Sequence, residues 1–366
     1  MANSTSNAAH ANSIEGSPVA QQSSEVHRPR GPHPLPLFWQ MARHAIGDGR
    51  ARMRRLMVAV ARYQAAAPVA AMPPPRTVAR DGNARLLSYG GEGPPVVLVP
   101  SLVNSPAILD LAPDRTLVRW LADEGFAAYL VAWGTPDARS RGFDLGDHVE
   151  RLDRLIADLP DAILVGYCLG GTLAMASAAT GRPRRALATI ATPWDFTGYP
   201  AGRRAEVAKW WRRTERLAAP LGEVPMDLIQ PAFWALDPAA PIAKFERYAR
   251  MGEDDPAARR FEAVEDWANS GAPVPLPAMR EAMAGLFEAN RTGTGTWRVG
   301  GRAVTPAAID MPWLNLVSAT DRIVPAAAAP PAKDTRPVAA GHVGMIVGGK
   351  AKTAVWEPLA RWLRSL

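Results

Sequence analysis

GYCLGG, residues 166–171, joins a short apolar run, AILVGY (162–167), to a helix-favouring run, GTLAMASAA (171–179). A short apolar run bounded by glycine and followed by a helical stretch is typical of an α/β protein. Glycines at 166, 170 and 171 let the backbone turn sharply and pack closely where side chains would clash. The stretch therefore predicts a strand, a tight turn and a helix, with Cys168, the single cysteine of the chain, at the turn.

Two interpretations of Cys168 follow from this position. A nucleophile is often held on a strained turn between a strand and a helix, and the positive end of the helix favours a thiolate there. Free cysteine is also among the residues most often buried as inert core. The six residues favour the nucleophile but leave the core interpretation open.

The rest of the main body repeats the strand and helix rhythm. Five further apolar runs predict strands, at 94–103, 127–133, 185–192, 312–319 and 335–341, and two runs predict helices, at 116–125 and 146–159. Unalternated apolar runs suit strands that are buried on both faces of a parallel sheet. We therefore expect a doubly wound, mostly parallel α/β sheet, with residues from about 200 to 300 inserted as a helical cap.

Composition divides the chain into three parts. Residues 1–35 are rich in Ser, Asn, Ala, Gln and Pro and predict a disordered tail. Residues 36–76 predict a basic amphipathic helical arm, which ends at a proline hinge at 73–75. Residues 77–366 form the α/β domain with its cap. Of the many tryptophans, Trp194, Trp210, Trp211, Trp234 and Trp267 could line an apolar channel, although tryptophan is more often core.

Net charge is concentrated in the arm. The first 80 residues hold ten arginines and three acidic residues, an excess equal to the formal net charge of +7 of the whole chain. The balanced main body gives no reason to expect nucleic acid as a partner. A basic helix could bind an anionic surface, but a solvated arginine-rich face is the simpler explanation. The apolar runs fall short of the ~18 residues that a membrane helix needs, so no span is expected.

Partners for Cys168 lie in the order that a strand–turn–helix nucleophile requires, namely nucleophile, acid and histidine. Asp321 follows the strand predicted at 312–319, and His342 follows the last predicted strand. His342 would exchange the proton and Asp321 would orient its ring. The backbone N–H groups of Leu169 and of Val103, in the turn after the first long strand, would form the oxyanion hole. His148 precedes the turn and is interpreted as a surface or helix-packing residue.

Several stretches resemble the polyhydroxyalkanoate synthases. The similarity covers residues from about 92 to 200, including Asn104, the Ile-Leu-Asp-Leu run at 108–111 and GYCLGGTLA at 166–174, and it resumes from 311 to 346 around Asp321 and His342. The resemblance implies an α/β-hydrolase fold and an acyltransferase that builds polyester from 3-hydroxyacyl coenzyme A through Cys168. It further implies no cofactor, action at a polyester granule surface, and a second copy or a helper subunit as partner. The single cysteine, which cannot form an internal disulfide, and the polar N-terminus, which lacks the apolar core of a signal peptide, favour a cytoplasmic location.

Two departures keep other functions open. The acid of that family is commonly followed by histidine, whereas Arg322 follows Asp321, and the chain is shorter than the single-subunit synthases. A polyhydroxyalkanoate depolymerase or another cysteine hydrolase, in which water reaches the acyl-cysteine, is the first alternative. A non-catalytic protein that binds granules on a hydrolase-like scaffold is the second, since a fold alone does not fix an activity.

Overall fold

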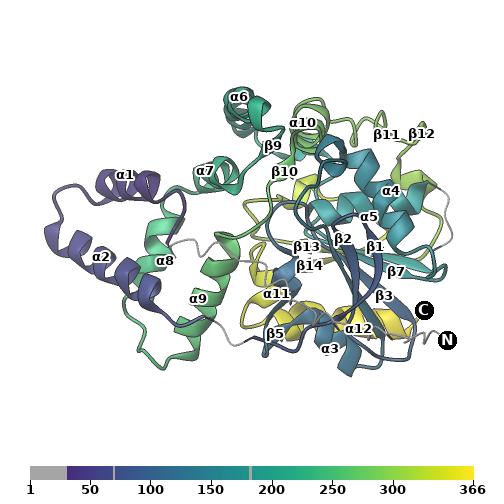
Figure 1. Ribbon diagram of the computed structural model, residues 1–366, viewed down its shortest axis with the longest axis horizontal. Helices are drawn as coiled ribbons and strands as arrows, with labels where there is room; N and C mark the ends of the chain where they lie inside the picture. Colours follow the sequence, from purple (N-terminus) through teal and green to yellow (C-terminus); the bar gives the residue numbers. More distant parts are fainter. Residues whose placement is uncertain (1–30, 69–70, 181–183) are drawn as a thin grey trace, which may run out of the picture.

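A central sheet of eight strands organises the computed structural model, which describes residues 31–68, 71–180 and 184–366 (Figure 1). The order across the sheet is β1-β2-β6-β3-β7-β8-β13-β14. The strands are β1 (Arg76–Asp81), β2 (Ala84–Ser88), β3 (Pro95–Val99), β6 (Ala127–Ala132), β7 (Ile163–Tyr167), β8 (Ala186–Ile190), β13 (Trp313–Ser318) and β14 (Asp334–Val338).

Strand direction identifies the fold. The pairs β1·β2 and β2·β6 are antiparallel, and from β6 to β14 every neighbouring pair is parallel. A mostly parallel sheet in which the fourth strand along the chain takes the third position is the α/β-hydrolase arrangement, so the predicted fold class is confirmed. Strands β1 and β2 were not predicted, since β1 carries charged residues along the edge of the sheet.

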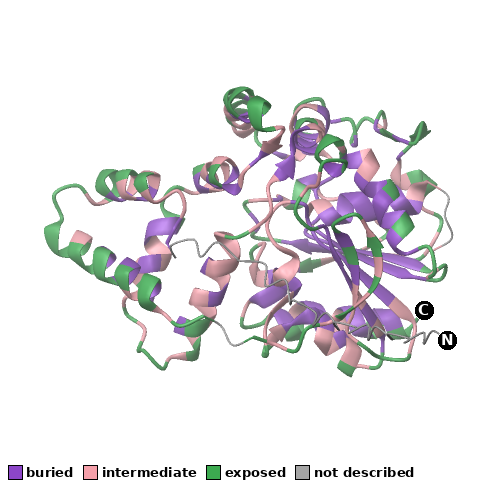
Figure 2. Ribbon diagram, in the orientation of Figure 1, coloured by how far each residue is buried: buried purple, intermediate pink, exposed green. Residues whose placement is uncertain are grey.

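Helices cover both faces of the sheet because alternate strand residues point to opposite sides. Val97 and Val99 pack with α4 (Leu145–Leu155) and α5 (Leu169–Ala179). Val96 and Leu98 pack on the other face with α3 (Leu117–Asp123), α11 (Gly344–Val347), η8 (Lys352–Trp356) and α12 (Glu357–Arg364). Figure 2 shows the buried strands enclosed between these two layers.

The segment between β8 and β13 leaves the sheet and returns to it, as a cap does. Its helices are α6 (Ala201–Ala218), α7 (Met226–Leu236), α8 (Ala240–Tyr248), α9 (Pro256–Ala268), α10 (Leu276–Arg280) and the π-helix η5 (Glu281–Glu288). Short strand pairs join them: β9 (Glu223–Val224) with β10 (Val274–Pro275), and β11 (Arg298–Val299) with β12 (Arg302–Ala303). A further pair, β4 (Asp110–Ala112) with β5 (Arg115–Thr116), lies between β3 and α3.

Two helices, α1 (Leu35–Ile46) and α2 (Arg50–Ala65), lie where the arm was expected and project away from the sheet (Figure 1). They pack on α8 through a separate apolar cluster that includes Phe38, Leu56 and Phe245. Arg62 fixes the end of α2 by donating to the carbonyls of Met251, at 2.6 Å, and Gly252, at 2.7 Å. The arm therefore belongs with the cap rather than with the sheet.

The predicted tail falls largely on residues 1–30, which lie outside the described residues. The prolines at 73–75 have no regular structure and lead directly into β1. Within the described ranges, no helix has both the length and the hydropathy needed to cross a bilayer.

Candidate active site

Cys168 occupies a strained turn between β7 and α5. Its backbone has φ 55° and ψ −132°, a conformation that non-glycine residues rarely adopt. A Cβ at Gly166 would lie 2.4 Å from Gly171 Cα, and one at Gly170 would lie 2.1 Å from the Val99 carbonyl oxygen. The glycines therefore permit the close approach that holds Cys168 at the carboxyl edge of the sheet.

Asp321 and His342 meet at the same edge. Asp321 follows β13, His342 follows β14, and the Asp321 Oδ2 atom is 2.5 Å from His342 Nδ1. The other carboxylate oxygen, Oδ1, accepts from the backbone N–H groups of Ile323 at 2.7 Å and Val324 at 3.0 Å. These bonds fix the carboxylate so that one oxygen remains for the imidazole.

The protonation of His342 depends on both of its neighbours. Burial alone would lower the pKa of His342, but the negative charge of Cys168, hydrogen bonds to Asp321 and Cys168, and the charge of Asp321 raise that pKa to about 10. The ring of Tyr167 lies 5.1 Å from the imidazole, measured between centroids, and limits its movement on one side. The three side chains can thus pass a proton between Cys168 and His342, with the Asp321 carboxylate stabilising the imidazolium.

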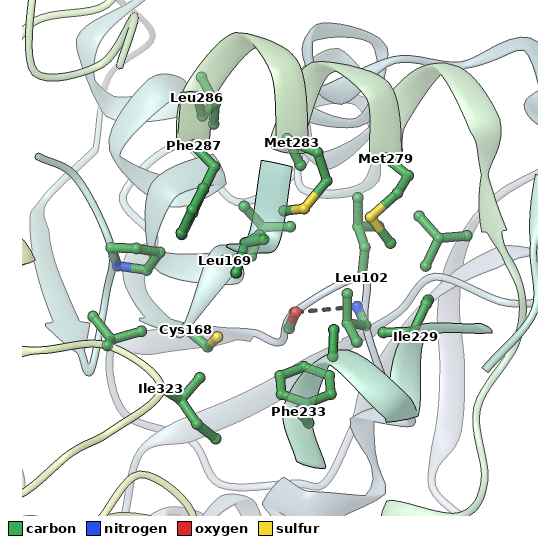
Figure 3. Close-up of a pocket in the computed structure, with 18 of the residues that line it drawn as sticks. Leu102, Cys168, Leu169, Ile229, Phe233, Met279, Met283, Leu286, Phe287 and Ile323 are labelled. Atoms are coloured by element: carbon green, nitrogen blue, oxygen red, sulfur yellow. Dashed lines mark hydrogen bonds between the residues drawn. The ribbon is translucent and has the colours of Figure 1, made fainter. Parts of the chain in front are cut away.

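The two candidate oxyanion donors differ. Leu169 follows Cys168 directly and is the first residue of α5, so its N–H has no acceptor within the helix. The N–H of Val103 donates to Ser101 Oγ at 3.1 Å, drawn as the dashed line in Figure 3. Leu169 can therefore stabilise an oxyanion as the structure stands, whereas Val103 must first release Ser101.

An apolar cavity of about 170 Å³ opens beside Cys168. Figure 3 shows side chains from the cap and from the sheet edge around it, with Cys168 at one side. We call it the apolar cavity; its labelled lining residues are Leu102, Cys168, Leu169, Ile229, Phe233, Met279, Met283, Leu286, Phe287 and Ile323. Among the residues that the structure describes, no Asp, Glu, Lys or Arg side chain lines it.

A second cavity, of about 590 Å³, reaches Cys168 from the side of His342. We call it the polar cavity because Asn104, Gln230, Lys244, Arg247 and Arg322 are among its lining residues. The two cavities share Cys168, and Phe233 and Ile323 line both. Cys168 is therefore the meeting point of an apolar and a polar space.

Two of the cations in the polar cavity have acidic partners. Lys244 Nζ is 2.6 Å from Glu265, and Arg322 pairs with Asp237. Arg247 is exposed, and no ion pair is found for it within the described part of the chain. Within those same ranges, His, Cys, Asp and Glu side chains form no group of three or more that could hold a metal ion.

Other residues considered from the sequence lie in different places. His148 is buried on α4 against Trp133 and Phe143, and burial lowers its pKa to about 4. The five tryptophans have different surroundings. Trp210 lines the apolar cavity, and Trp234 and Trp267 line the polar cavity. Trp194 and Trp211 belong to the hydrophobic core.

Tyr199 was not anticipated as part of the site. Its hydroxyl donates to the Ile323 carbonyl at 2.9 Å and so holds the loop that carries Asp321. Its sequence context, at the start of the cap, gave no signal for this contact.

Comparison with known proteins finds no family model that matches the chain. The poly(3-hydroxyalkanoate) polymerase subunit PhaC of Haloferax mediterranei is 27% identical over 313 residues, which cover 79% of this chain and 63% of that protein. The subunit of the same name from Allochromatium vinosum is 28% identical over 290 residues, 74% of this chain and 80% of the relative. The chain thus spans about three fifths of the length of the haloarchaeal relatives.

Similarity to solved structures concerns the fold alone. DcsB, solved in complex with a substrate analogue, matches with a TM-score of 0.50 at 17% identity, over 79% of this chain and 98% of DcsB. The sequence relatives, together with the strand order, give the same assignment as the motifs did. The chain is similar in sequence to the poly(3-hydroxyalkanoate) polymerase subunits PhaC and carries the α/β-hydrolase fold.

Proposed function

We propose that the chain is a polyhydroxyalkanoate synthase-like acyltransferase, which moves 3-hydroxyacyl groups from coenzyme A thioesters to a growing polyester. The observation that supports this most is the position of Cys168. It lies where the apolar and polar cavities meet and where His342, backed by Asp321, reaches it. A thiolate exchanges readily with a thioester and can store the acyl group for a later attack.

The first half-reaction forms an acyl-cysteine. His342 takes the thiol proton, and the Cys168 thiolate attacks the thioester carbonyl to form a tetrahedral oxyanion near the Leu169 N–H. Collapse breaks the carbon–sulfur bond to coenzyme A, and His342 returns its proton to the departing thiolate. Asp321 stabilises the imidazolium that forms, because its Oδ2 atom lies 2.5 Å from His342 Nδ1.

The second half-reaction forms the ester. The hydroxyl of a chain end or of another 3-hydroxyacyl group gives its proton to His342 while its oxygen attacks the acyl-cysteine carbonyl. The Cys168 thiolate leaves and recovers the proton from His342. Arg247 in the polar cavity, for which no ion pair is found among the described residues, suits a phosphate of coenzyme A, and this supports entry of the thioester from that side.

Hydrolysis is the second candidate. The polar cavity that reaches Cys168 has room for water, which could replace the hydroxyl and release a free hydroxyacid. The chemistry up to the acyl-cysteine would be the same, so the product rather than coenzyme A release separates the two functions.

The test is incubation of the full chain with 3-hydroxyacyl coenzyme A substrates of four to twelve carbons, following coenzyme A release and the acyl product. We expect polyester, with the rate lowered about a thousandfold or more in Cys168→Ala and His342→Ala. His44→Ala, an exposed histidine on α1, is the matched control and should retain the wild-type rate. Free hydroxyacid alone would indicate a hydrolase, and unchanged release in Cys168→Ala would refute the acyl-cysteine.

A further inference from the structure

The apolar cavity offers few polar atoms although it adjoins a reactive side chain. Apart from Ser101, Cys168, Tyr199 and Trp210, every lining side chain is aliphatic, methionine, proline or phenylalanine. The Tyr199 hydroxyl is already engaged with the Ile323 carbonyl, and Ser101 Oγ accepts from Val103. A ligand in this cavity would therefore find few partners for hydrogen bonds.

This lining discriminates among the parts of the proposed substrates. The arm of coenzyme A carries amides and phosphates, and a polyester chain carries an ester carbonyl at every repeat. Burying such groups without partners is unfavourable. The hydrocarbon tail beyond the 3-hydroxyl has no polar atoms, and its transfer out of water is favourable. The tail is thus the part of the substrate that fits the apolar cavity.

Cavity size sets the length of that tail. An apolar cavity of about 150 Å³ in another protein takes up benzene, a ligand of six carbons. The apolar cavity here measures about 170 Å³. In 3-hydroxybutyryl only a methyl group extends beyond the hydroxyl-bearing carbon, whereas in 3-hydroxyoctanoyl five carbons do, a tail that the space can hold.

Flexible side chains at the cap favour such a tail further. Met279, near the end of α10, and Met283, on η5, point into the cavity in Figure 3. Methionine is unbranched and polarizable, and it adapts to irregular apolar ligands. The wall opposite the sheet edge can therefore adjust to tails of somewhat different length.

We propose that the apolar cavity binds the alkyl tail of the acyl group and that the chain prefers medium-chain 3-hydroxyacyl thioesters, of about six to ten carbons, over 3-hydroxybutyryl. This specificity rests on the acyltransferase function proposed above. Each methylene that enters the cavity raises kcat/KM about fourfold, given the usual free energy of burying such a group. The gain stops once the tail fills the space, so dodecanoyl substrates lose part of it.

The first experiment compares kcat/KM for 3-hydroxybutyryl, 3-hydroxyhexanoyl, 3-hydroxyoctanoyl and 3-hydroxydodecanoyl coenzyme A. We expect the octanoyl substrate to exceed the butyryl substrate by about tenfold or more. A decline from four carbons onward would overturn the inference while leaving the acyltransferase function intact.

Ala232 provides a variant that fills the cavity. It lies on α7 and lines the apolar cavity, whereas Ala235, on the same helix, is exposed and lines neither cavity. Ala232→Phe should lower the octanoyl-to-butyryl ratio about tenfold or more, because the added ring occupies the space of several methylenes. Ala235→Phe is the matched control and should leave the ratio unchanged. An unchanged ratio in Ala232→Phe would contradict the proposal.

Met283→Ala is a second variant, needed in case Ala232→Phe fails to fold. It enlarges the apolar cavity, whereas Ala232→Phe fills it, so the preferred tail should lengthen towards dodecanoyl.

Binding supplies a readout that needs no turnover: Cys168→Ala, titrated by calorimetry, should bind 3-hydroxyoctanoyl coenzyme A about tenfold or more tightly than 3-hydroxybutyryl coenzyme A. Absent turnover with this binding difference would refute the acyltransferase alone, whereas equal binding would refute the tail site.

Discussion

At the level of single residues, the proton on His342 reports whether Cys168 acts as its partner. The negative charge of Cys168 and the contact with Asp321 raise the pKa of His342 to about 10 against the opposing effect of burial. We expect Cys168→Ala and Asp321→Asn each to lower this pKa, since each removes a charge that stabilises the imidazolium. NMR titration of labelled histidine would measure it, with exposed His44 as the internal reference. A His342 that titrates identically in wild type and Cys168→Ala would contradict the pairing.

The raised pKa of His342 also makes the free energy of unfolding depend on pH. An unfolded histidine has a pKa of about 6.5, so between that value and the folded value of about 10 the native state binds a proton that the unfolded state lacks. The contribution of His342 to the free energy of unfolding is therefore fully present below about pH 6.5 and is lost as the pH rises towards 10. Urea unfolding across this range should show a steeper loss for wild type than for Cys168→Ala. Parallel profiles would argue against the shift.

Asp321 and His342 could be named as candidate site residues from the sequence because each follows the carboxyl end of a recognisable strand. Their placement beside Cys168 then follows from the fold, since the carboxyl ends of parallel strands share one edge. The sequence could not predict the hydrogen bond from Val103 N–H to Ser101 Oγ, because that bond depends on a side-chain rotamer. Nor could it predict the contact between Tyr199 and the Ile323 carbonyl, because Tyr199 comes from the cap.

At the level of elements, the turn between β7 and α5 depends on glycine for space. A Cβ at Gly170 would meet the Val99 carbonyl oxygen at 2.1 Å and Pro100 backbone atoms at 2.5 Å. Backbone atoms cannot move aside as a flexible side chain can, so we expect Gly170→Ala to lower the free energy of unfolding by about 3 kcal/mol. Gly202→Ala in α6 is the control, because nothing lies within 4 Å of its Cβ position. Urea unfolding that finds the two variants equally stable would refute this account of the turn.

The strands that are covered on both faces were predictable from continuous apolar runs, and so was β14 at one edge of the sheet, whereas β1 at the other edge and its neighbour β2 were not. β3 and β7 are covered on both faces and so read as continuous apolar runs. β1 lies at the sheet edge and alternates half-buried and exposed residues, among them Arg76, Arg80 and Asp81. Its charges suit an edge position but conceal the strand from a search for apolar runs.

At the level of the whole molecule, three apolar clusters divide the chain into parts that can unfold separately to different degrees. Two clusters enclose the sheet, and the third joins α1 and α2 to α8. Composition predicted a basic helical arm, but no pattern indicated where the arm would pack, because its contacts join distant parts of the chain: Arg62 and Met251 are 189 positions apart.

Phe38 lies at the centre of the third cluster and is fully buried. Its ring packs edge-on against the rings of Trp39, Trp234 and Phe245, at centroid distances of 5.3, 6.2 and 5.4 Å. Two of these three rings come from the cap, so Phe38 is a main link between the arm and the cap.

This division predicts that the arm can open without disturbing the sheet. Phe38→Ala removes a buried ring, a change that costs about 3–5 kcal/mol in a core, and here the loss falls on the third cluster alone. Hydrogen exchange of the amides in α1, α2 and α8 should therefore accelerate by about a hundredfold or more, while exchange in β3 and β7 stays at the wild-type rate. Met57→Ala, on the exposed side of α2, is the control and should change neither. If the strands accelerate together with the arm, the arm and the sheet unfold as one cooperative unit, and the third cluster contributes to the stability of the site itself.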